Sequence, residues 1–326
     1  MSKSLLLLFL LIATLGVQAQ DGYRISGKID GVADGELLLV SDENGRSEQM
    51  ATTRITNGAF MFTGKVDAPV AVYITTPDQK VVIPFILENT VVMLNVGDSR
   101  ALIKGGEQQD IFARFNRLTV DLLQLQNQYQ QAYLQAEQAR DKKKLQELTK
   151  QFEEAVTLVQ QKEKELLQQH ADSYAAAYVV AAGARSLELE PLKARYNLLG
   201  ETAKQTVPGR FVASQIEELE QLSVGNEAPD FTVVSQTGDS LSLYPIKSKL
   251  KLLVFWDSNN LKCREDNVTF LDIYQKYHLR GLEIVSISRE GNRQAWLKAI
   301  NQDGMFWKLG VKGGYIHTWM AYDYKR

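Results

Sequence analysis

The first third of the chain consists of short apolar runs separated by turn signals such as Asn57-Gly58. Within one run, Phe60 and Phe62 alternate with polar or smaller neighbours, which suits a sheet with one covered face. The runs are rich in β-branched and aromatic residues, as strands are. They cover residues 23–29, 35–42, 58–66, 70–76, 81–88 and 90–97. We therefore predict an all-β, sandwich-like domain over residues 21–106.

The next region is predicted to be helical, from residue 107 to 222. Residues 107–169 contain no glycine or proline, and residues 139–144 are the expected turn between two antiparallel helices. Apolar residues recur at steps of three and four, which places each set on one helix face. The sets are Ile111, Phe115, Leu118, Leu122, Leu125 and Tyr129, then Leu145, Leu148, Phe152, Ala155 and Val159. These stripes indicate packing within the chain or, alternatively, self-association or a coiled-coil contact with a partner.

Residues 223–326 show the pattern of an α/β domain. Residues 250–256 and 281–288 are continuous apolar runs of strand length, as in buried parallel strands. Helical patterns follow each of them, over residues 264–277 and 292–300. A strand-helix-strand-helix order with short links predicts a parallel sheet with right-handed crossovers.

Residues 1–20 have the pattern of a secretory signal peptide. Lys3 precedes the apolar run 5–17, and small residues follow, so we expect cleavage after Ala19 or Gln20. A membrane anchor is the alternative, but the run is shorter than the roughly 20 residues that span a bilayer. No cysteine lies near the cleavage point, so a lipoprotein is not expected. The mature chain shows no other run of spanning length and is predicted to be periplasmic or otherwise extracytoplasmic.

Charge and motifs exclude several classes of function. The 37 basic and 39 acidic residues are mixed and leave a net charge of -2, so we expect no nucleic-acid partner. His170, His278 and His317 are scattered without ligand spacing, which predicts no metal site. No glycine-rich phosphate loop follows a strand, so no cofactor is expected. Arg289-Glu290, after the second apolar run, is interpreted as a solvated ion pair.

Four motifs in the last region carry a family resemblance. They read VGNEAPDF, TGDSLSL, KLLVFWDSNNLKCRE and LDIYQKYHLRGLEIVSIS, between residues 224 and 288. In order and spacing they resemble the AhpC/TSA family and the TlpA-like thiol-disulfide oxidoreductases. The resemblance implies a thioredoxin-like fold, redox or antioxidant activity, and a protein thiol, a protein disulfide or a peroxide as the reaction partner. The preceding regions resemble the N-terminal β domain of unknown function and the helical spacer of one bacterial subgroup.

The resemblance also exposes a missing sulfur. The family's first cysteine falls on Asn260 and its second on Cys263, the one cysteine of the sequence. Dithiol exchange needs one thiolate to attack the substrate and a second thiol to resolve the mixed disulfide. Asparagine is a preferred N-cap residue, and its side chain is expected to accept a hydrogen bond from the N–H of Lys262 or Cys263. We therefore expect dithiol activity to be lost.

Three roles remain open for Cys263. It is a small buried residue beneath the helix, a monothiol or peroxidatic cysteine supported by the charges of Lys262 and Arg264, or one half of an intermolecular disulfide. A single cysteine cannot form a disulfide within the sequence. If Cys263 is inert, the chain is predicted to act as a non-catalytic, extracytoplasmic binding module.

The end of the sequence departs from the family as well. Every proline lies at or before Pro245, whereas the family's substrate-groove cis-proline would fall at or beyond Arg326. The strand pair and helix that follow it in the family would also be missing. We therefore expect an incomplete thioredoxin-like domain, from a gene fragment or a naturally short variant. The strand predicted over residues 250–256 would then lose one neighbour and expose backbone groups.

Overall fold

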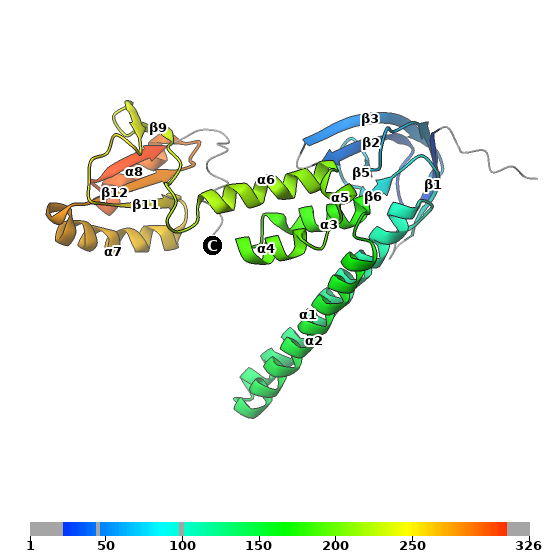
Figure 1. Cartoon of the computed structure of the whole chain (residues 1–326), viewed down its shortest axis with the longest axis horizontal. Helices are drawn as coiled ribbons and strands as arrows, with labels where there is room; N and C mark the ends of the chain where they lie inside the picture. The colour runs from blue at the N-terminus through cyan, green and yellow to red at the C-terminus, as the bar shows by residue number, and fades with distance from the viewer. Residues whose placement is uncertain (1–21, 44–45, 98–100, 312–326) are drawn as a thin grey trace, which may run out of the picture. The chain divides into compact units, whose positions relative to one another are not determined.

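The computed structural model describes residues 22–43, 46–97 and 101–311. The predicted signal peptide, residues 44 and 45, His317 and the tail lie outside these residues. The chain divides into two compact units between Gln215 and Ile216, and each is described by itself (Figure 1). The domain boundaries predicted after residues 106 and 222 stay predictions.

The first unit begins with two four-stranded sheets. Their orders are β4-β1-β7-β8 and β3-β2-β5-β6. The strands are β1 (Tyr23–Ile29), β2 (Gly35–Glu43), β3 (Arg46–Ile55), β4 (Ala59–Gly64), β5 (Val70–Thr75), β6 (Val82–Leu87), β7 (Val91–Val96) and β8 (Ala101–Lys104). Ile25 and Leu94 of one sheet share a buried core with Leu39 and Phe85 of the other. The predicted all-β, sandwich-like fold is confirmed.

The sequence missed two strands of this sandwich, β3 and β8. Both lie at the edge of their sheets. The sequence of β3 is RSEQMATTRI and that of β8 is ALIK, and most of their described side chains are exposed or half-buried. An edge strand that contributes few side chains to the core has a weak alternation signal.

Six helices follow in the described chain. They are α1 (Glu107–Gln138), α2 (Lys142–Gln169), α3 (Tyr174–Ala184), α4 (Leu189–Tyr196), α5 (Glu201–Lys204) and α6 (Val207–Gln221). Helices α1 and α2 lie side by side as a long hairpin (Figure 1), and the rings of Tyr129 and Phe152 meet across it at 5.4 Å. The predicted apolar stripes therefore pack within the chain. Ser173 caps α3 by accepting a hydrogen bond from the Ala176 N–H.

Two buried side chains, one on α1 and one on α3, bind the helices to the sheet β3-β2-β5-β6. The Gln109 side-chain oxygen accepts a hydrogen bond from the Ile86 N–H at 2.9 Å. The Tyr174 hydroxyl accepts one from the Ala71 N–H at 2.9 Å and donates one to the Glu43 carboxylate at 3.0 Å. Burial, reinforced by the nearby Glu43 charge, raises the pKa of Tyr174 well above its ordinary value, so the hydroxyl stays protonated and can donate. These bonds satisfy strand N–H groups that would otherwise be buried without acceptors.

The second unit holds a five-stranded sheet of order β10-β9-β13-β12-β11. Its elements are β9 (Thr232–Ser235), β10 (Ser240–Ser242), β11 (Leu250–Trp256), α7 (Leu261–Tyr277), a 3-10 turn (His278–Arg280), β12 (Leu282–Ser288), α8 (Arg293–Asp303) and β13 (Lys308–Val311). β11, β12 and β13 run parallel, and β9 pairs antiparallel with β13 and β10. Trp256, Ile284 and Trp296 belong to the core that includes α7 and α8. The α/β, thioredoxin-like fold predicted for this region is confirmed.

The two long parallel strands differ in burial. Every residue of β12 is buried, as the sequence predicted. In β11 only Trp256 is buried, and Leu250 is 65% exposed. The prediction of a fully buried strand is wrong for β11, because within the described residues it pairs on one side only. The four-residue strand β13 was not predicted.

Replacing Tyr174 by Phe should destabilise the first unit by about 1–3 kcal/mol, because the buried Ala71 N–H loses its acceptor. Trp256, Trp296, Trp307 and Trp319, the four tryptophans of the sequence, all lie beyond Gln215. In urea, the unfolding transition followed by circular dichroism should therefore occur at a lower concentration than in the parent. The transition followed by tryptophan fluorescence should stay at the same concentration. The control Tyr133→Phe alters an exposed ring and should leave both unfolding transitions unchanged. A Tyr174→Phe variant as stable as the parent would contradict the assigned role.

Candidate functional site

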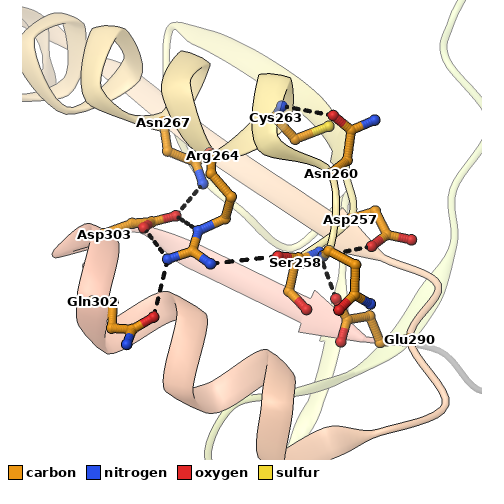
Figure 2. Close-up of polar contacts among 10 residues, drawn as sticks. Asp257, Ser258, Asn260, Cys263, Arg264, Asn267, Glu290, Gln302 and Asp303 are labelled. Carbon is orange, nitrogen blue, oxygen red and sulfur yellow. Dashed lines mark hydrogen bonds and ion pairs between the residues drawn. The ribbon is translucent and has the colours of Figure 1, made fainter.

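The candidate site lies where α7 begins, after the end of β11. Asn260 has extended backbone angles and precedes the first residue of α7. Its side-chain oxygen accepts a hydrogen bond from the Cys263 N–H at 3.2 Å (Figure 2). Its carbonyl oxygen accepts one from the Arg264 N–H at 3.1 Å. Asn260 is therefore the N-cap of α7, as the sequence predicted, and Cys263 rather than Lys262 is the donor.

The loop before this cap is held by Glu290, which follows the end of β12. The Ser258 N–H donates to the Glu290 carboxylate at 2.5 Å, and both residues are buried. Asp257 accepts hydrogen bonds from the N–H groups of Asn259 and Asn260. The interpretation of Glu290 as part of a solvated ion pair is wrong. A buried carboxylate is retained here because a backbone donor satisfies it.

Arg264 connects the first turn of α7 to the end of α8. Its guanidinium forms two hydrogen bonds with the Asp303 carboxylate, both at 2.5 Å (Figure 2). A third bond goes to the Ser258 carbonyl oxygen at 3.4 Å. The fully buried Asn267 donates to the same carboxylate at 2.8 Å. The hydrogen bond with Asp303 raises the pKa of Arg264 further, so the guanidinium keeps its charge at all ordinary pH values.

Cys263 lies on the inner side of α7, in contact with the core. It is 5% exposed and belongs to the same buried cluster as Trp256 and Trp296. The two cations expected to support a thiolate are each paired with a carboxylate. Lys262 binds Asp266 at 2.8 Å and Arg264 binds Asp303. Because these charges are compensated locally, they offer a sulfur little net positive potential.

The start of α7 therefore carries an amide as its cap. An amide oxygen accepts hydrogen bonds but is neither oxidised nor reduced under the conditions that oxidise thiols. The helix N-terminus still presents partial positive charge and backbone donors. Exposed Leu261 and Asn259 flank the cap.

Two classes of feature are missing from the described part of the chain. It contains no cluster of His, Cys, Asp and Glu side chains able to hold a metal ion. None of its helices combines the length and apolarity that crossing a bilayer requires.

Two regions match known families. Residues 23–112 match a domain of unknown function, DUF4369. Residues 224–316 match the AhpC/TSA family. The second match covers the cap, the cysteine and the loop described above. The resemblance stated from the motifs is thereby confirmed.

Similar proteins include the thiol-disulfide oxidoreductase ResA of Bacillus thuringiensis, 27% identical over 95 residues, which are 29% of this chain and 55% of ResA. Peroxiredoxin Q of Triticum aestivum is 33% identical over 82 residues, covering 25% of this chain and 38% of the relative. The chain thus spans about half the length of ResA and less than half the length of Peroxiredoxin Q. A solved thioredoxin domain of a Bacteroides vulgatus thiol-disulfide oxidoreductase is 29% identical over 27% of this chain and 64% of that domain, with a TM-score of 0.27. A Bacteroides fragilis thiol-disulfide oxidoreductase is 25% identical over 30% of this chain and 75% of the other, with the same TM-score of 0.27.

Replacing Asn260 by Ala should destabilise the second unit by about 1 kcal/mol, because the Cys263 N–H loses its acceptor. The matched variant Asn260→Asp keeps a capping oxygen and should retain most of the stability. Urea unfolding of the full chain, followed by tryptophan fluorescence, measures both. Equal stability of Asn260→Ala and the parent would show that the Asn260 side chain does not stabilise the start of α7.

Proposed function

Because residues 224–316 belong to the AhpC/TSA family, we propose that the chain is an exported thioredoxin-fold protein that has lost dithiol activity and acts by binding. The family and its oxidoreductase relatives indicate protein thiols or disulfides as the general class of partner. The pattern of residues 1–20 supports export to the periplasm or another extracytoplasmic compartment.

One observation carries the loss of activity: the Asn260 amide caps α7 at the position where the resemblance places the attacking cysteine. Thiol-disulfide exchange oxidises two thiols to one disulfide and transfers two electrons. With one cysteine per chain, an exchange reaction would stop at a mixed disulfide until an external thiol resolved it. The chain therefore lacks the couple that turnover requires.

The surroundings of Cys263 support the same proposal. A reactive cysteine is partly exposed and lies in an electropositive environment. Cys263 is buried, and the neighbouring Lys262 and Arg264 are paired with carboxylates. The cysteine then contributes to packing, and the outer surface of the site is left for binding.

A one-cysteine peroxidase is the second candidate, and the similarity to Peroxiredoxin Q favours it. In that reaction the Cys263 thiolate attacks one peroxide oxygen and the O–O bond breaks. The sulfur is oxidised to sulfenic acid, and the other oxygen leaves as water or an alcohol after protonation. An external thiol then reduces the sulfenic acid. This route requires peroxide to reach a sulfur that is 5% exposed.

The first test restores the missing sulfur. Asn260→Cys supplies an attacking thiol at the helix N-terminus, three residues before Cys263. With dithiothreitol as the reductant, the parent protein should not accelerate insulin reduction, whereas Asn260→Cys should. The matched control Asn259→Cys adds a thiol at the wrong spacing and should stay inactive. Catalysis by the parent protein would overturn the proposal.

The second test measures the reactivity of Cys263. In the folded full chain, iodoacetamide should modify it at least about tenfold more slowly than in urea, because access requires local opening. Hydrogen peroxide should leave its mass unchanged under the same conditions. Cys263→Ser should preserve the biological phenotype if the protein acts by binding. Rapid oxidation in the folded protein would favour the one-cysteine peroxidase instead.

A further inference from the structure

The outer side of α1 carries a second series of residues at heptad spacing, here called the outer stripe. It consists of Val120, Leu123, Asn127, Gln130 and Leu134. A helix turns by about 100° per residue, so the outer stripe lies opposite the side with Leu122 and Tyr129 that faces α2. Its apolar members are 50%, 54% and 48% exposed, in chain order.

Most of the outer stripe lies in a segment without charge, between Asp121 and Glu137. Residues 122–136 contain no Asp, Glu, Lys, Arg or His. The facing helix is different, since α2 has many Lys and Glu residues over its whole length. An exposed helix normally keeps charged side chains towards water. Depletion of charge around apolar residues is instead typical of the centre of a protein–protein interface.

The chemistry of the outer stripe favours a second copy of this chain as its binding partner. A strongly acidic or basic partner would find no complementary charge on residues 122–136. Helices that bind bilayer surfaces carry Lys and Arg on the polar face, and these are absent from the same segment. Two copies, in contrast, would meet without like-charge repulsion. Amide side chains donate and accept hydrogen bonds, so surfaces with Gln and Asn are complementary to themselves.

Asn127 occupies the centre of the outer stripe. It lies seven residues after Val120 and seven residues before Leu134. With a two-fold axis at this position, Asn127 meets its own copy, and their amides can pair. In coiled coils, an asparagine at one core position selects a register and an oligomeric state at some cost in stability.

We propose that two copies of this chain associate through the outer stripe of α1, around a two-fold axis at Asn127. The stripe is about 21 Å long at 1.5 Å per residue, so the interface is small and the dimer is weak and reversible. This inference concerns the first unit and does not depend on the function proposed for the second.

Sedimentation velocity of the full chain, from about 1 to about 500 µM, tests the dimer, because an interface of this size needs high concentration. The parent protein should approach twice its monomer mass, 36.7 kDa for the whole sequence. The double variant Leu123→Glu, Leu134→Glu should weaken dimerisation by about tenfold or more. Leu158→Glu changes an equally exposed leucine on α2 and should have no effect. A monomeric parent protein, undiminished association of the double variant, or equal weakening by Leu158→Glu would overturn the proposal.

Crosslinking tests the position of the axis. In the Cys263→Ser background, Asn127→Cys places a thiol beside its own copy, so oxidised glutathione should produce a covalent dimer on non-reducing gels. The matched variant Leu158→Cys should remain monomeric under the same conditions. These side chains are exposed, so the variants should fold, and circular dichroism checks this. A covalent dimer formed equally well by both variants, or by neither, would contradict a two-fold axis at Asn127.

Discussion

One hydrogen bond, from the Cys263 N–H to the Asn260 side chain, determines where α7 begins. The first N–H groups of a helix have no partners within it, so a helix start needs acceptors from outside. Asn260 supplies one of them. The loop that carries Asn260 is held in turn by the bond between Ser258 and Glu290, and the first turn of α7 by the bonds between Arg264 and Asp303. The burial of Cys263 follows from this fixed start, because the sulfur faces the core when α7 begins at Leu261.

The same helix end would serve a different purpose in a dithiol enzyme. There, the partial positive charge of the N-terminus stabilises a thiolate, which makes the site reactive and leaves the helix start less well capped. Here a neutral amide caps the helix and the nearby cations are neutralised by Asp266 and Asp303. The polar groups described around the cap thus stabilise the helix start. That consistency is compatible with the loss of dithiol activity proposed above.

Local signals in the sequence were sufficient for most of the elements, and for the cap. Asn260 was identifiable because capping depends on residue type and on neighbours three positions away. Glu290 was not, because its partner Ser258 is 32 residues distant and only the sheet brings them together. The edge strands β3 and β8 were missed because side chains that face water show little hydrophobic alternation. The reverse error occurred at β11, whose apolar sequence is that of a central strand although it lies at the edge of the sheet that the structure describes.

The bonds made by Gln109 and Tyr174 affect how the β sandwich can be inherited. The match to DUF4369 runs to residue 112 and so includes Gln109 on the first turn of α1. A gene fusion that moved only the strands to a new host would leave the Ile86 and Ala71 N–H groups without acceptors. Recombination that succeeds must therefore carry the start of α1, and the host must offer a hydroxyl in place of Tyr174.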